Sequence, residues 1–100
     1  MSVIMSERAW RTEVRPARHK LLLLALADYA DSRGNVSIGV RAVADRTNLR
    51  IEACDIGFED LCDEGLVDDV EFSQGPDGAR FWKCRLTLPA LPAAAVRREA

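Results

Sequence analysis

The sequence predicts a small α+β domain in which helices come first and a β-hairpin closes the fold. Two observations support this prediction. Residues 17–31 are rich in leucine and alanine, which are strong helix formers. Near the other end, two strand-like runs flank the sequence QGPDG, whose composition favours a tight turn. One hundred residues, 48% of them hydrophobic and 30% charged, suit a single globular domain with one modest core.

The first predicted helix begins just after Pro16, because the fixed φ of proline suits a first helical turn. Its apolar residues cover nearly the whole circumference. Such a helix is expected at the centre of a core or against a partner. Gly34 marks the stop after the helix. The run LLLLALA within it is too short to span a membrane, and a signal peptide would need a leader containing acids and a proline. We therefore expect a cytoplasmic protein with no membrane contact.

The remaining elements follow in a clear order. NVSIG predicts a short strand, Val40 to about Arg46 a second helix, and TNL a tight turn. A third helix is expected from about Arg50 to Glu64, ended by Gly65. LVDDVEFS and ARFWKCRLTL then form the hairpin, with Trp82 on its core side. The predicted organisation is a basic N-terminal arm over residues 1–14, a domain over 15–88, and a tail or short helix over 89–100.

Charge is distributed unevenly along a chain whose net charge is only -2. Residues 1–20 hold five basic residues against two acidic ones, whereas residues 48–69 hold eight carboxylates and one arginine. In the third helix, the residues with core character share one face: Cys54, Gly57, Phe58 and Leu61. The opposite face carries four acids and one isoleucine: Glu52, Asp55, Ile56, Glu59 and Asp63. Like charges three or four residues apart destabilise a helix by a few tenths of a kcal/mol each.

Three stretches carry a resemblance to a known family. LLLLALADYADSRGNVSI, VRAVADRTNL and LCDEGLV resemble the winged helix-turn-helix modules of phage and mobile-element proteins, including the N-terminal parts of phage replication initiators. The resemblance covers about Arg15 to Leu88 and implies three helices, a short first strand and a C-terminal β-hairpin wing. It also implies that the third helix is the recognition helix, which normally offers hydroxyl and basic residues to the DNA major groove. Here those positions hold residues of different character: Arg50, Glu52, Ala53, Asp55 and Ile56.

Duplex DNA is a polyanion, so an acidic helix is poorly suited to groove insertion. Three interpretations follow. In the first, the helix binds a basic surface of a nucleic-acid-handling protein by partial DNA mimicry, as CRISPR inhibitors and antirestriction proteins of phage do. The candidate contact residues are Glu52, Asp55, Ile56, Glu59, Asp60 and Asp63.

In the second interpretation, the protein is a phage replication or transcription factor that contacts DNA through its basic arm and wing. The candidate residues are then Arg8, Arg11, Arg15, Arg18, Arg50, Arg80, Lys83 and Arg85. In the third, the basic arm of the same chain, or of a dimer mate, simply neutralises the acidic helix. The sequence is compatible with a monomer or a homodimer.

No feature predicts an enzyme, a cofactor or a metal site. The single histidine, His19, lacks the partners of a catalytic triad or a zinc site. Cys54 and Cys62 lie about 12 Å apart along one helix, too far for a disulfide, so reduced thiols are expected. Trp10, in the basic segment, is a candidate either for packing across the domain or for a partner contact.

Overall fold

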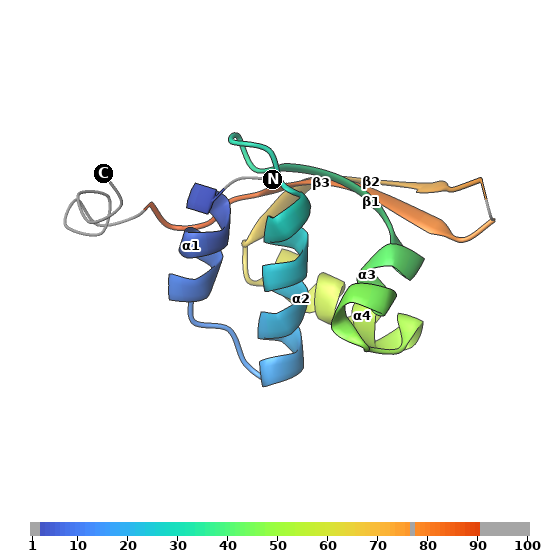
Figure 1. Cartoon of the computed structure of the whole chain (residues 1–100), viewed down its shortest axis with the longest axis horizontal. Coiled ribbons are helices and arrows are strands. Elements are labelled where there is room, and N and C mark those ends of the chain that lie inside the picture. The colour runs from blue at the N-terminus through green and yellow to red at the C-terminus, as the bar shows by residue number, and fades with distance from the viewer. Residues whose placement is uncertain (1–2, 77, 91–100) are drawn as a thin grey trace.

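The computed structural model describes residues 3–76 and 78–90, in which four helices lie on one side of a three-stranded antiparallel sheet (Figure 1). The elements are, in chain order, α1 (Val3–Arg11), α2 (Ala17–Tyr29), β1 (Asn35–Gly39), α3 (Val40–Thr47), α4 (Ile51–Asp63), β2 (Val67–Gln74) and β3 (Arg80–Leu86). The predicted α+β class is confirmed. The helices and strands expected between residues 15 and 88 occur in the predicted order, but the described residues contain four helices rather than three.

The additional helix is α1, where the sequence predicted a basic arm. Met5 and Ala9 are buried on one side of α1, followed by the buried Thr12, at the i, i+4, i+7 spacing of one helical face. This face packs against α2. Arg8 donates hydrogen bonds to the carbonyl oxygens of Leu88 and Pro89, which ties α1 to the chain after β3. Residues 3–11, where the sequence predicted a basic arm, therefore form a packed helix, which corrects that prediction. Of the tail predicted over residues 89–100, residues 91–100 lie outside the described residues.

Helix α2 forms the centre of the core, as its apolar circumference predicts. It contacts α1, α3, α4 and β1, and the side chains of Leu22, Leu23 and Leu26 are fully buried. Burying a leucine side chain stabilises a fold by about 1.5–3 kcal/mol. Within the described residues no helix is long and apolar enough to cross a membrane.

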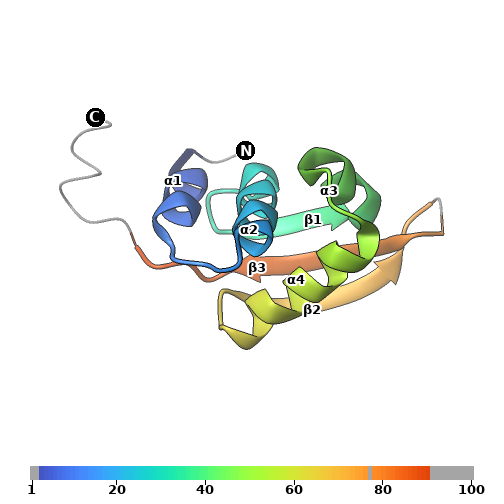
Figure 2. The same ribbon diagram turned by 90° about the horizontal axis from the view of Figure 1, so that it is seen from below.

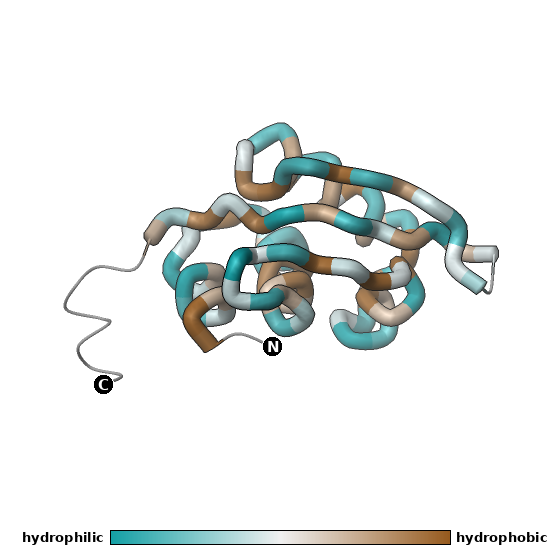
Figure 3. The backbone as a smooth tube through the Cα atoms, turned by 90° about the horizontal axis from the view of Figure 1, so that it is seen from above, coloured by the Kyte–Doolittle hydropathy of each residue, from teal (hydrophilic) through white to brown (hydrophobic). Residues whose placement is uncertain are grey.

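Strand β3 lies in the middle of the sheet, between β1 and β2 (Figure 2). Val36 faces Cys84 and Ile38 faces Trp82, so the apolar side of β1 continues that of β3. The register between β2 and β3 shifts between Asp68 and Glu71. Seen from the open side of the sheet, hydrophobic and hydrophilic positions alternate along the strands (Figure 3). This alternation places one side of the sheet in the core and leaves the other bare of helices.

A glycine at the end of the loop after α2 allows a close approach of two backbone segments. Gly34 has a φ of +87°, and a Cβ atom at this position would lie 2.7 Å from the carbonyl oxygen of Leu86. Its own carbonyl accepts a hydrogen bond from the Leu86 N–H at 2.8 Å. The sequence predicted Gly34 as the stop of the helix, but α2 ends at Tyr29 with Ala30 in an extended conformation. Gly34 instead joins the loop to the end of β3.

Candidate functional site

The candidate site is the outward face of α4. Cys54, Gly57, Phe58 and Leu61 are buried beneath it, as their spacing predicts. Four residues on the other side are exposed: Glu52, Ile56, Glu59 and Asp63. We call these four the acidic stripe. Ile56, the one apolar side chain among them, is 57% exposed, so the stripe offers an apolar contact among three carboxylates.

Aromatic packing fixes the rotation of α4 about its axis. The ring of Phe58 stacks on Trp82 of β3, with the ring centroids 4.3 Å apart and the planes at 23°. On its other side, Phe58 meets Phe72 of β2 edge to face at 6.0 Å. Trp82 is fully buried, which confirms its predicted place in the core. With this face of α4 held against the sheet, the acidic stripe must point away from the core.

A glycine allows α4 to approach α2 closely. A Cβ atom on Gly57 would lie 2.8 Å from Cδ2 of Leu22 and 3.2 Å from Cδ2 of His19, both of which are side-chain atoms of α2. His19 is buried, and its Nδ1 lies 3.2 Å from a carboxylate oxygen of Asp60. Asp60, one of the predicted contact residues, therefore faces α2 and has a partner within the chain.

Asp55, another predicted contact residue, is also engaged. Its carboxylate forms an ion pair at 3.1 Å with Arg80 at the start of β3. The sequence did not predict this pair, which joins α4 to the hairpin. By contrast, Glu52, Glu59 and Asp63 form no ion pair with any residue in 3–76 or 78–90. The three acids of the stripe therefore have no counter-ion among the described residues.

Most of the basic residues predicted as DNA contacts are also engaged within the chain. Arg11 pairs with Glu7 at 3.1 Å, and Arg15 pairs with Glu13 at 3.0 Å. Arg8 binds backbone carbonyls and Arg80 pairs with Asp55, as described above. Arg85 contacts Asp68 at 3.1 Å and Asp69 at 3.5 Å, and these carboxylates raise its pKa. The three remaining candidates, which are exposed and form no ion pair within the described residues, are Arg18, Arg50 and Lys83.

These three cations come from different parts of the fold. Arg18 lies at the start of α2, Arg50 directly precedes α4, and Lys83 lies on the bare side of β3. Arg50 is the residue next to the acidic helix itself. The described structure therefore does not gather the predicted basic residues on one element.

A trough runs between α4 and the β2–β3 hairpin. It consists of two hollows of about 330 and 610 Å³, which share Asp55, Phe72 and Arg80 in their walls. The guanidinium carbon of Arg80 lies 5.3 Å from the centre of the Phe72 ring, a cation–π contact. Phe72 is 57% exposed, although it lies on the helix side of the sheet. The pattern LVDDVEFS indicated a strand, but the exposure of Phe72 depends on its distance from the core and was not predictable.

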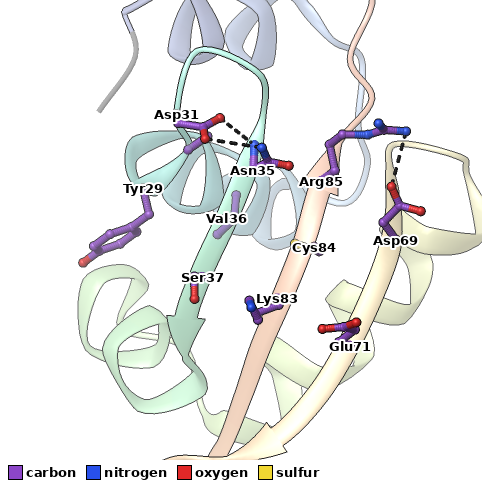
Figure 4. Close-up of a pocket in the computed structure, with 11 residues that line it drawn as sticks. Tyr29, Asp31, Asn35, Val36, Ser37, Asp69, Glu71, Lys83, Cys84 and Arg85 are labelled. Atoms are coloured by element: carbon purple, nitrogen blue, oxygen red, sulfur yellow. Dashed lines mark hydrogen bonds and ion pairs between the residues drawn. The ribbon is translucent and has the colours of Figure 1, made fainter.

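The bare side of the sheet carries a second hollow, of about 470 Å³, lined by polar side chains of both signs (Figure 4). At its upper end Asp31 accepts hydrogen bonds from the backbone N–H groups of Asn35 and Arg33, which lower the pKa of its carboxyl group. At its other side, Arg85 pairs with Asp69. The charged groups at these two ends have partners within the chain, so this hollow is a weaker candidate than α4.

The three cysteines of the chain all lie among the described residues. All three thiols are free, with Cys54 and Cys84 buried. Burial raises the pKa of the Cys84 thiol to about 12 and also raises the pKa values of Cys54 and Cys62. No three histidine, cysteine or acidic side chains among the described residues are grouped to hold a metal ion.

Trp10, which the sequence left open between packing and partner contact, is 64% exposed on α1. It borders a small hollow between α1 and α2, of about 250 Å³, together with Leu21 and Leu24.

Comparisons of the chain with protein-family models, with curated protein sequences and with solved structures found no significant match.

Proposed function

We propose that this chain is a small winged-helix protein of the phage or mobile-element type, whose acidic stripe binds a basic surface of a nucleic-acid-handling protein. In this proposal α4 occupies the position of a recognition helix and the β2–β3 hairpin that of the wing. The partner is the kind of protein that a CRISPR inhibitor or an antirestriction protein blocks. The single observation that carries the proposal is the set of three exposed carboxylates on α4 without ion pairs in the described part of the chain: Glu52, Glu59 and Asp63.

The spacing of these carboxylates suits a row of cations. Glu59 and Asp63 are four residues apart, about 6 Å along the helix axis, and Glu52 lies about 10 Å from Glu59 at about 1.5 Å per residue. Each DNA strand carries one charge per about 3.4 Å of helix axis, so these spacings correspond roughly to every second and every third phosphate of a strand. Ile56, between the first two acids, adds an apolar contact of the kind that interface centres require.

Two observations weigh against neutralisation of the stripe by its own chain. The basic N-terminal segment forms α1, which packs against α2, and the extensive contacts of α4 are with α2, α3 and β2 (Figure 2). The arginines of this segment that have partners bind Glu7, Glu13 or backbone carbonyls rather than α4. A dimer mate that covers the stripe would be detected as an oligomer in solution.

The alternative function, DNA binding through the basic residues, has less support from the geometry. Arg80 and Arg85, two of the three wing residues in that hypothesis, are each paired with an aspartate. DNA would have to displace those carboxylates or bind through Arg18, Arg50 and Lys83 alone.

The test compares the partners captured from a nuclease-treated bacterial lysate by three forms of the protein. The stripe variant is Glu52→Gln, Glu59→Gln and Asp63→Asn. A control variant, Glu13→Gln, Asp45→Asn and Glu71→Gln, makes the same change in net charge elsewhere. We expect the native and control proteins to capture a basic nucleic-acid-binding protein that the stripe variant loses. An unchanged set of captured proteins with the stripe variant would contradict the proposal, as would a partner that the native protein captures from untreated lysate but not after nuclease treatment.

A further inference from the structure

The smaller hollow of the trough is lined only by aromatic and charged residues. Its walls are the two phenylalanine rings of Phe58 and Phe72, the carboxylates of Asp55 and Glu59, and the side chain of Arg80. We call this hollow the aromatic–acidic pocket. Its volume is about 330 Å³. Phe58 forms its buried floor, whereas Phe72 and Glu59 are exposed.

The chain itself shows which chemical group this lining accepts. Arg80 places its guanidinium over the ring of Phe72, at 5.3 Å, and pairs with Asp55 at 3.1 Å. An aromatic face together with a carboxylate is the environment that a guanidinium prefers, because it can stack and donate hydrogen bonds at once.

The charges of the pocket do not balance. Asp55 and Glu59 contribute two negative charges and Arg80 one positive charge. Since Arg80 pairs with Asp55, Glu59 remains without a counter-ion in the described residues. The pocket therefore has one negative charge in excess beside a partly exposed aromatic ring.

We infer that the aromatic–acidic pocket receives one arginine side chain of the basic partner, between the carboxylate of Glu59 and the ring of Phe72. This inference rests on the proposed function and adds to it a specific contact and a preference for arginine over lysine. The guanidinium is planar and weakly hydrated, and its donors match a carboxylate in a forked geometry, whereas the ammonium of lysine is a strongly hydrated point charge. Glu52 and Asp63, which do not line the pocket, would attract either residue equally.

The test is an NMR titration of the ¹⁵N-labelled full chain with two probes, a hexa-arginine peptide and a hexa-lysine peptide. We expect the native protein to bind the arginine peptide several-fold more tightly. The amide signals of Phe58, Glu59 and Phe72 should shift with the arginine peptide more than with the lysine peptide. Phe72→Leu keeps an apolar side chain on the strand but removes the ring, so we expect it to abolish the preference for arginine while lysine binding stays unchanged.

Two further variants separate this inference from the proposed function. Glu59→Gln should reduce arginine binding more than lysine binding, whereas Glu52→Gln, on the stripe but outside the pocket, should weaken both peptides to the same extent. Equal affinity for the two peptides, or a preference for arginine that survives Phe72→Leu, overturns the arginine pocket but does not contradict binding by the acidic stripe. If neither peptide binds, or if Glu52→Gln has no effect on either, the proposed function fails as well.

Discussion

We expect repulsion among the carboxylates of the acidic stripe to lower the free energy of unfolding, so removing these charges should raise it. The perturbation is the stripe variant Glu52→Gln, Glu59→Gln and Asp63→Asn. It eliminates four like-charge pairs at i,i+3 or i,i+4 spacing: Glu52–Asp55, Asp55–Glu59, Glu59–Asp63 and Asp60–Asp63. Each pair destabilises a helix by about 0.2–0.5 kcal/mol, so their removal contributes about 1–2 kcal/mol.

Three other effects modify this sum. Arg80 lies beside Asp55 and reduces the repulsion in the pairs that include this residue. Asp63 at the end of α4 interacts unfavourably with the helix dipole, whereas Glu52 in the first turn interacts favourably, each by about 0.3–1 kcal/mol. The two dipole effects cancel approximately. The expected gain in the free energy of unfolding is therefore about 1 kcal/mol, which for a domain of this size corresponds to a rise in Tm of about 4–8 °C.

The assay is thermal unfolding followed by circular dichroism at low ionic strength, repeated in about 1 M salt, where the Debye length falls to about 3 Å. The gain should shrink at high salt because it arises from exposed charges. The control variant Glu13→Gln, Asp45→Asn and Glu71→Gln should show no rise in Tm, although its net charge changes equally. A stripe variant with unchanged or lower Tm at low salt, or a gain that persists at high salt, would refute the reasoning.

Two further predictions concern the core. Gly57→Ala should lower the midpoint of urea unfolding, because a methyl group 2.8 Å from Leu22 overpacks the α2–α4 contact at a cost of about 1–3 kcal/mol. This cost exceeds the roughly 1 kcal/mol by which alanine is the better helix former. A midpoint above that of the native protein would show that the core accommodates the methyl group without strain. The raised pKa of Cys84 should make stability fall with pH in the alkaline range. Because the folded-state pKa of this thiol is about 12 against an ordinary value of 9.0, its contribution is fully present below pH 9 and is lost as the pH rises toward 12. Denaturation at a series of alkaline pH values should show this decline and a smaller one in Cys84→Ala; identical slopes for the two proteins would argue against it.

Local patterns in the sequence were sufficient to predict α2, α3, α4 and the hairpin. Gly65 indeed adopts a positive φ of +76° directly after the C-cap of α4, because that conformation is accessible to glycine at little cost. Gly34 has a φ of +87° but lies in the loop beyond α2, which ends at Tyr29. Local patterns did not predict α1, because the basic residues of this segment indicated a solvated arm although Met5, Ala9 and Thr12 have the spacing of a buried helical face. That spacing could have indicated a helix. However, a nine-residue helix is stable only when it packs against other elements, and the surface of α2 that stabilises α1 is formed only in the tertiary structure.

The sequence by itself determined that α4 is amphipathic and that its outward face is acidic, because a period of 3.6 residues assigns each side chain to a face without reference to the rest of the fold. Only the tertiary structure decided which of those acids stay free of partners. Arg80, 25 positions from Asp55, reaches it through the packing of the hairpin on α4, and His19 reaches Asp60 through the contact of α2 with α4. Ion pairs form between groups a few ångströms apart, and distances across the fold depend on how helices and strands pack, which helical periodicity does not specify.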